Sequence, residues 1–321
     1  MVRTLWRGEV MKVLSLFDGI SCGRVALERA GIPVDTYYAS EIEASSIAIS
    51  KRNYPDIIQL GDVTKWREWD IPWDEIDLLI GGSPCQGFSF AGKKLNFDDP
   101  RSKLFFEFVD ILNHIKKHNP CVRFLLENVV MREDHKKVIS DMLGVEPVLI
   151  NSSSVCAQRR PRLYWCNFRI PEIPEECSQT LRDVFDPNVE HHEIHINHPD
   201  TIVKCKTYYQ YDQNRRGHKS QCQRFFDIDT KCNTLLFSSS SIPKVKADDG
   251  KIYLMNVEEC AKLQTLDPNY LDVEGVSKSA KHSAIGNGWT VDVIALIFRG
   301  LSESKPKSSS NWLTELLSGI A

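Results

Sequence analysis

The sequence has little that would mark a membrane-spanning, secreted or fibrous protein. No apolar run approaches the roughly 20 residues that span a bilayer, and residues 1–10 contain no apolar core of a secretion signal. Ten cysteines are scattered without a single CxxC pair, which excludes a disulfide framework and an obvious zinc site. With 17 glycines and 15 prolines, the chain is neither collagenous nor of low complexity. We expect a cytoplasmic, globular protein with reduced thiols and no membrane partner.

A net charge of −3 argues against a nucleic-acid partner, but the charge is unevenly distributed. Residues 201–251 hold ten Lys and Arg against five Asp and so carry a local charge of +5. The same stretch contains Tyr208, Tyr209, Tyr211, Phe225 and Phe226. Basic residues interleaved with aromatic ones are typical of a nucleic-acid surface, and a solvated charged face is the alternative.

Apolar runs and helical patterns alternate along the first half of the chain. The predicted strands cover residues 13–17, 36–42, 57–63, 76–80 and 122–126, and the predicted helices between them cover 23–30, 44–52 and 101–118. This alternation predicts an α/β fold with a doubly wound parallel sheet. Helical spacing returns at 257–266 and 290–301. We therefore expect one large domain from residues 12–168 and 251–301, a smaller domain of short strands over 169–250, and a linker and tail over 302–321.

In a doubly wound fold, ligands bind at the loops that follow the strands. The loop of Phe17, Asp18 and Gly19 has a glycine for a tight turn but lacks the full GxGxxG spacing, which disfavours NAD and leaves another nucleoside cofactor open. Glu41 follows the second strand, where an acid binds ribose hydroxyls, and Asp62 follows the third, where it could accept from an adenine amino group. A surface carboxylate is the alternative for each.

The loop after the fourth strand carries a cysteine directly after a proline, with glycines on both sides. Cys85 in this position is exposed enough to act as a nucleophile, whereas a structural cysteine usually lies inside a strand. The next strand ends in Glu127, Asn128 and Val129. The carboxyl group of Glu127 is therefore expected to face Cys85 across a shared pocket.

Five motifs in this order resemble those of the DNA (cytosine-5)-methyltransferase family, over roughly residues 12–301. They are Phe17-Asp-Gly, Ser83-Pro-Cys-Gln86, Glu127-Asn-Val129, Gln158-Arg-Arg-Pro-Arg162 and Gly286-Asn-Gly288. Gly288-Trp-Thr-Val is similar to the catalytic domain of the animal de novo methyltransferases, whereas Pro84-Cys-Gln-Gly-Phe-Ser89 and Glu259-Cys-Ala-Lys-Leu-Gln264 are similar to compact bacterial and phage enzymes.

The resemblance implies transfer of a methyl group from S-adenosylmethionine to carbon 5 of a cytosine flipped out of double-stranded DNA, leaving S-adenosylhomocysteine. It implies that Cys85 adds to carbon 6, and that Glu127 holds the exocyclic amine and shares a proton with ring nitrogen 3. Arg162 would bind the ring carbonyl, and Arg160 would support the pocket as a fourth member of the catalytic group.

The resemblance also implies a cofactor site and a DNA-contacting set within a doubly wound S-adenosylmethionine-dependent (Rossmann-like) domain and a target-recognition domain. The expected cofactor residues are Phe17, Asp18, Gly19, Glu41, Ile42, Asp62, Val63, Pro84, Leu104, Asn287 and Trp289. The expected DNA contacts are Gln86, Ser89, Arg101, Arg224 and Thr234. Gly288 stands where many members of that family have Ser, so a side-chain contact to the carboxylate of the cofactor is not expected there. No metal is expected, although His191, His192, His195 and His198 form a histidine-rich stretch.

Three other interpretations stay open. A transfer-RNA cytosine methyltransferase would share the catalytic residues, but the Cys-Phe-Thr signature of that branch is missing. A catalytically silent module that regulates a partner is the second, and the intact Cys85, Glu127 and Arg162 argue against it. A generic NAD-dependent enzyme is the third. We expect a monomer, and the sequence fits a solitary, a phage-borne or a restriction-modification enzyme equally.

Overall fold

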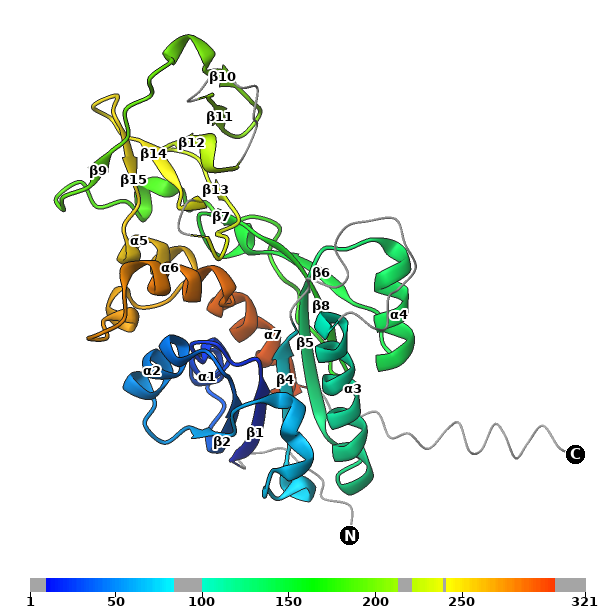
Figure 1. Ribbon diagram of the computed structural model, residues 1–321. Helices are drawn as coiled ribbons and strands as arrows, with labels where there is room; N and C mark the ends of the chain where they lie inside the picture. The colour runs from blue at the N-terminus through cyan, green and yellow to red at the C-terminus, as the bar shows by residue number, and fades with distance from the viewer. Residues whose placement is uncertain (1–9, 84–99, 213–220, 239–240, 304–321) are drawn as a thin grey trace, which may run out of the picture.

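The structure is a computed structural model that describes residues 10–83, 100–212, 221–238 and 241–303. Its central feature is a seven-stranded sheet (Figure 1). In spatial order the strands are β3 (Ile58–Gln59), β2 (Val34–Ser40), β1 (Met11–Leu16), β4 (Leu78–Gly82), β5 (Arg123–Val129), β8 (Pro161–Cys166) and β6 (Val148–Asn151). The expected α/β fold class is confirmed.

The sheet is mixed, which corrects the expectation of a purely parallel one. Strands β1 to β5 pair in parallel, whereas β8 runs antiparallel to both β5 and β6. The third predicted strand was also too long, because β3 has two residues and Val63 begins a 3-10 helix, Val63–Glu68. The fifth strand, β5, continues beyond residue 126 to Val129, so that Glu127 and Asn128 lie at its end, as expected from the sequence.

Helices cover both faces of the sheet. The described helices are α1 (Cys22–Arg29), α2 (Ala44–Asn53), α3 (Pro100–His118), α4 (Glu133–Leu143), α5 (Val257–Leu263), α6 (Lys278–Asn287) and α7 (Val291–Glu303). Residues of α1, α2 and α5 to α7 share one apolar core with one face of the sheet, and α3 and α4 share a second core with the other face.

The buried strands have continuous apolar sequences because helices cover both faces of the sheet. In β4, Leu78 and Ile80 lie in the first core and Leu79 lies in the second, as the two-residue period of a strand requires. Residues 278–302 are long and apolar enough to cross a membrane, contrary to expectation, but 67% of their most apolar window is buried inside the protein. Packing in the first core accounts for that apolarity.

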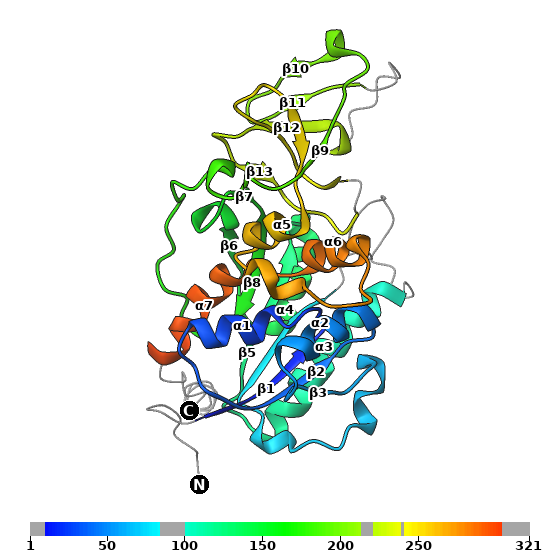
Figure 2. The same ribbon diagram turned by 90° about the vertical axis from the view of Figure 1, so that its left-hand side faces the viewer.

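A second lobe lies beyond the carboxyl ends of the parallel strands (Figures 1 and 2). Its six-stranded sheet has the order β10 (Val203–Lys204), β11 (Tyr209–Gln210), β12 (Arg224–Asp227), β14 (Lys244–Lys246), β15 (Ile252–Leu254) and β9 (His192–Glu193). A further pair joins β13 (Cys232–Asn233) to β7 (Gln158–Arg159). The lobe sheet therefore runs past residue 250, and Phe226 and Val245 in it belong to the first apolar core.

Candidate active site

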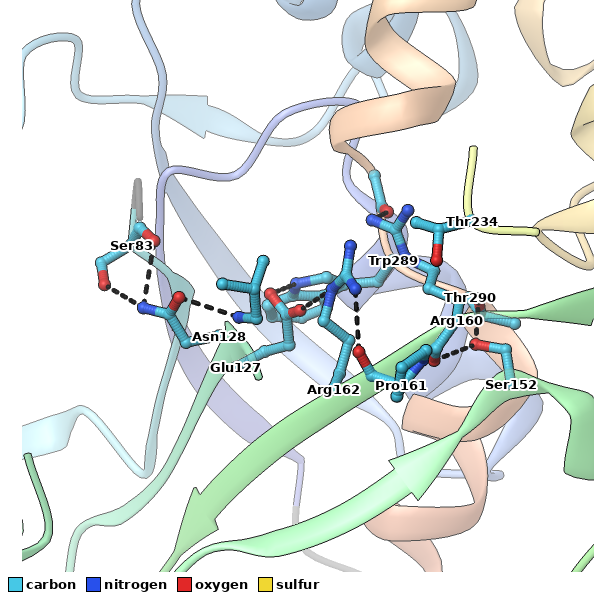
Figure 3. Close-up of polar contacts among 12 residues, drawn as sticks. Ser83, Glu127, Asn128, Ser152, Arg160, Pro161, Arg162, Thr234, Trp289 and Thr290 are labelled. Atoms are coloured by element: carbon cyan, nitrogen blue, oxygen red, sulfur yellow. Dashed lines mark hydrogen bonds and ion pairs between the residues drawn. The ribbon is translucent and has the colours of Figure 1, made fainter. Parts of the chain in front are cut away.

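Glu127 lies at the centre of a hydrogen-bonded group near the end of β5 (Figure 3). The Nε atom of Arg162 lies 2.9 Å from Oε1 of Glu127, and the Nε1 atom of Trp289 donates to Oε2 at 3.1 Å. The side chains of Glu127 and Arg162 are each 12% exposed. β5 and β8 pair side by side and bring Glu127 and Arg162 together, whereas Trp289 comes from the turn between α6 and α7.

Arg162 keeps donor capacity beyond its ion pair with Glu127. Its Nη1 atom donates to the carbonyl of Pro161 at 2.8 Å, and Nη2 has no partner among the described residues. A guanidinium is a planar fork of five donors, so its orientation is fixed by two contacts while a further donor stays free. The arrangement can bind a carbonyl oxygen of a ligand beside a carboxylate.

Asn128 connects β5 to the strand that precedes the predicted cysteine loop. It is 2% exposed, and its Nδ2 donates to the Oγ of Ser83 at 3.2 Å. Its own Oδ1 accepts from the backbone N–H of Val129 at 2.8 Å. The last described residue before Pro84 is therefore fixed relative to Glu127. The sequence placed Asn128 at this strand end but assigned it no role.

Arg160 lies behind the site and is 4% exposed. Its guanidinium donates to the carbonyls of Leu235, Gly286 and Gly288 at 2.9, 3.1 and 3.0 Å. Burial lowers the pKa of Arg160 to about 10, so that it remains charged at neutral pH. These contacts place Arg160 as a support that joins the turn before Trp289 to the smaller lobe.

Asp18 and Glu41 lie at the carboxyl ends of β1 and β2, which pair in parallel. The backbone N–H of Gly19, at a φ of 59°, donates to Oε2 of Glu41 at 2.8 Å. Tyr37 donates its hydroxyl to Asp18 at 2.8 Å, and Ser21 donates as well. Burial raises the pKa of Asp18 to about 6 in spite of these hydrogen bonds. Two carboxylates thus lie beside a tight turn at one sheet edge.

Asp62 lies at the corresponding end of β3 and caps the 3-10 helix that follows. Its Oδ1 accepts from the backbone N–H and the hydroxyl of Thr64, each at 2.9 Å, and these bonds lower the pKa of Asp62. Its Oδ2 has no partner among the described residues. The first three strand ends therefore each offer a carboxylate acceptor to a ligand.

The remaining expected cofactor residues have varied surroundings. Val63 is 5% exposed and Ile42 is 75% exposed, while Phe17 and Leu104 pack at the margin of the second core. Asn287 is exposed at the last position of α6. Contact of these five with one ligand stays a prediction.

Arg224 and Thr234 lie in or next to the smaller lobe, and the hydrogen bonds described for them go to residues other than Glu127. The Arg224 guanidinium stacks 4.4 Å from the ring centroid of Tyr208, and its Nε donates to Gln210 at 3.2 Å. The hydroxyl of Thr234 donates to the carbonyl of Arg159 at 2.9 Å. Arg224 is thus held in one orientation, whereas the hydroxyl of Thr234 is used to join the lobe to β7.

Several expected residues cannot be placed. Pro84, Cys85, Gln86 and Ser89 lie outside the described residues, and the side chain of Arg101 is not described. Their roles stay predictions from the sequence. Among the described residues there is no group of three metal-ligating side chains, and His191 donates to or accepts from the buried carboxylate of Glu259 at 2.9 Å.

A buried polar network was missed by the sequence reasoning. The Thr290 hydroxyl bonds to Oε1 of Gln264 at 2.6 Å and lies 2.8 Å from the hydroxyl of Ser152. Gln158 donates to Oε1 of Gln264 at 3.1 Å and accepts from the backbone N–H of Leu235 at 2.8 Å. Gln158 is the first residue of the fourth motif, and its place in that motif was the only feature of the sequence that could have pointed to this network.

The sheet order and the reversed β8 are those of the S-adenosylmethionine-dependent methyltransferase fold. The family model described as C-5 cytosine-specific DNA methylase matches residues 11–303, and the chain belongs to this family. The family predicted from the sequence is therefore confirmed.

Curated relatives are similar over part of the chain. "Type II methyltransferase M.NgoBV" of Neisseria gonorrhoeae is 41% identical over 123 residues, which are 37% of this chain and 28% of that one. "Type II methyltransferase M1.ScrFI" of Lactococcus lactis subsp. cremoris is 44% identical over 126 residues, 39% of this chain and 30% of that one. The matches thus span less than a third of these relatives.

A solved structure shows the same fold over nearly the whole chain. The methyltransferase EhMeth of Entamoeba histolytica has a TM-score of 0.69 at 15% identity and covers 92% of this chain and 99% of its own. At this identity the likeness concerns the fold alone.

Proposed function

We propose that the protein methylates carbon 5 of cytosine in double-stranded DNA with S-adenosylmethionine as the donor. The observation that carries this proposal is the group of Glu127, Arg162 and Trp289, in which a carboxylate and a free guanidinium nitrogen lie side by side. The edge of cytosine presents an amino group, a ring nitrogen and a carbonyl in a row. A carboxylate next to a guanidinium matches that row.

The chemistry requires activation of the ring before methylation. Carbon 5 becomes nucleophilic when a thiolate forms a bond to carbon 6: the electron pair of the 5,6 double bond moves between carbons 4 and 5, and the pair of the carbon 4–nitrogen 3 double bond moves to nitrogen 3. Glu127 would supply the proton that nitrogen 3 takes up, and Nη2 of Arg162 would bind the carbonyl oxygen. Cys85 is the proposed thiolate on sequence grounds. Once carbon 5 carries the methyl group, it loses its proton to solvent or a base, the thiolate leaves carbon 6 so that the 5,6 double bond forms again, and nitrogen 3 returns its proton to Glu127.

The residues at the strand ends fit the cofactor. S-adenosylmethionine, when bound, supplies a methyl group on a positively charged sulfur as the electrophile for carbon 5. Glu41 has lone pairs left beyond its backbone bonds for ribose hydroxyls, and the free Oδ2 of Asp62 could accept from an amino group. Asp18 would place negative charge near the methionine end. All are acceptors, as a ligand with hydroxyl, amino and ammonium groups requires.

The smaller lobe supports DNA as the partner. The segment of residues 201–251, nearly all of it in this lobe, has a net charge of +5 that favours phosphate contacts. Arg224 is held by Tyr208 and Gln210 in a way that suits base or phosphate contact. Because carbon 6 is inaccessible in a duplex, the target base must be flipped out. A monomeric, cytoplasmic enzyme, either solitary or paired with a restriction enzyme, is consistent with these features.

The direct test is incubation with S-adenosylmethionine and mixed-sequence duplex DNA, followed by bisulfite sequencing. The expected result is 5-methylcytosine in one short sequence context, and its loss in Cys85→Ser with cofactor affinity retained. Cofactor binding without DNA methylation would contradict the proposal. Parallel incubation with transfer RNA then separates an RNA enzyme from a silent module.

A further inference from the structure

The indole nitrogen of Trp289 makes a hydrogen bond to the proposed catalytic carboxylate of Glu127. Nε1 donates to Oε2 of Glu127 at 3.1 Å, while Arg162 takes Oε1 (Figure 3). Oε2 of Glu127 therefore accepts one hydrogen bond, Oε1 lies at ion-pair distance from the guanidinium, and both oxygens keep lone-pair capacity for a ligand. A hydrogen bond on one oxygen and an ion pair on the other fix the rotation of the carboxylate about its last torsion, which is otherwise soft.

The backbone around Trp289 is shaped for this contact. A Cβ on Gly82 would lie 2.9 Å from Nε1 of Trp289 and 3.0 Å from Oε2 of Glu127, so only glycine leaves room for the hydrogen bond. A Cβ on Gly23 would lie 3.4 Å from Cζ3 of the same indole. A Cβ on Gly288, next to Trp289 in the chain, would lie 3.2 Å from the sulfur of Cys22. Strand β4 and helix α1 thus both lie close to the indole.

We infer that Trp289 is a positioning residue that orients the carboxylate of Glu127 for the cytosine edge, in addition to its expected place beside the cofactor. This inference rests on the proposed function. A carboxylate that must hold an amino group with one oxygen and serve ring nitrogen 3 with the other must lie in the plane of the base. Arg162 alone leaves Oε2 unrestrained, and the indole N–H supplies the second restraint.

Trp66 offers a matched control. Its Nε1 donates to Oε2 of Glu107 at 2.8 Å, in the second core and outside the proposed catalytic and binding residues. Trp66→Phe therefore removes the same kind of hydrogen bond elsewhere in the protein. Trp289→Phe removes the N–H of the inferred donor and keeps an aromatic ring.

The first measurement needs no enzymatic activity. In the ¹⁵N-tryptophan-labelled full chain, Glu127→Gln should move the indole N–H resonance of Trp289 upfield, because a charged acceptor becomes neutral. The Trp66 resonance should stay in place, and it should move in Glu107→Gln. An unmoved Trp289 resonance overturns the inference whether or not the protein methylates DNA.

The second measurement separates positioning from cofactor binding. Trp289→Phe should lower kcat about 10-fold to 100-fold, the range for losing a hydrogen bond to a charged group, with the Kd for S-adenosylmethionine changed less than about 3-fold. Trp66→Phe should leave both values unchanged. If Trp289→Phe raised the Kd for S-adenosylmethionine 10-fold and left kcat at saturation unchanged, Trp289 would only line the cofactor site, and the inference would be overturned. An inactive wild type contradicts the proposed function, and the resonance test still decides the contact.

Discussion

Asp18 shows how a single enclosed carboxyl group ties stability to pH. Burial is the main cause that raises its pKa to about 6 from an ordinary 3.8. The folded state therefore binds this proton more tightly than the unfolded chain, and the stabilisation is complete below the unfolded value and is lost as pH rises through about 6. From a shift of this size, the group contributes about 1 kcal/mol more at pH 5 than at pH 7.

Asp18→Asn should remove this dependence, because an amide does not titrate. Measured by urea unfolding at pH 5, 6 and 7, the free energy of unfolding of the wild type should fall relative to the variant as pH rises. A difference that grows with pH would show that the hydrogen bonds from Ser21 and Tyr37 outweigh burial.

The two arginines of the fourth motif should respond differently to the same substitution. Arg160→Lys cannot reach Leu235 and the 286–288 turn together, so the free energy of unfolding should fall by about 3 kcal/mol. Arg162→Lys should keep most of the stability and lose kcat, because a point charge does not replace the fork. Thermal unfolding and methyl transfer measured on both variants check this. Equal loss of stability in the two would contradict it.

At the scale of elements, Gly286 sets how closely α6 approaches the smaller lobe. A Cβ there would lie 2.2 Å from the carbonyl oxygen of Leu236, a backbone atom that cannot rotate away. Gly286→Ala should therefore lower the free energy of unfolding by roughly 2 kcal/mol or more, despite the better helix propensity of alanine. Gly23→Ala is the control, because its nearest contact is the mobile Cδ1 of Ile80 at 2.5 Å. Urea unfolding should rank Gly286→Ala as the more damaging variant.

Elements with strong periodicity were predictable, and those fixed by tertiary pairing were not. Leu104 to Ile115 repeat at helical spacing, so α3 was predicted nearly to its ends. The direction of β8 depends on its partner β5, which no local pattern encodes. Strands of two residues, such as β9 and β13, are too short to show a period.

The contacts of the candidate site also separate into those that the sequence predicts and those that depend on tertiary structure. Glu127 and Arg162 could be named because their types and motifs indicate the chemistry, and β5 with β8 brings them together. The bond from Trp289 to Glu127 joins residues 162 apart in the sequence, so spacing carried no sign of it. The hydrogen bonds from Arg160 to backbone carbonyls could not be predicted either, because a sequence motif does not distinguish a buried guanidinium from an accessible one.

At the scale of the whole molecule, the two lobes are joined by polar contacts inside a continuous apolar core. Gln158 is fully buried, donates to the carbonyl of Leu263 at 3.0 Å and accepts from the N–H of Leu235. One amide thus satisfies backbone groups from the C-terminal segment of the large domain and from the smaller lobe. Because no water reaches it, its loss would leave both groups unpaired.

Gln158→Leu should accordingly lower the free energy of unfolding by about 2–6 kcal/mol, since each of the two unpaired buried backbone groups costs roughly 1–3 kcal/mol. Gln221→Leu removes a similar amide bond, to the carbonyl of Thr234 at 2.8 Å, but Gln221 is half-buried and water can replace it. That control should cost well under 1 kcal/mol. Limited proteolysis of Gln158→Leu should cut first within residues 169–250, because the lobe is then held less tightly to the rest. Uniform cutting along the chain would show that the network stabilises the large domain and does not hold the lobe.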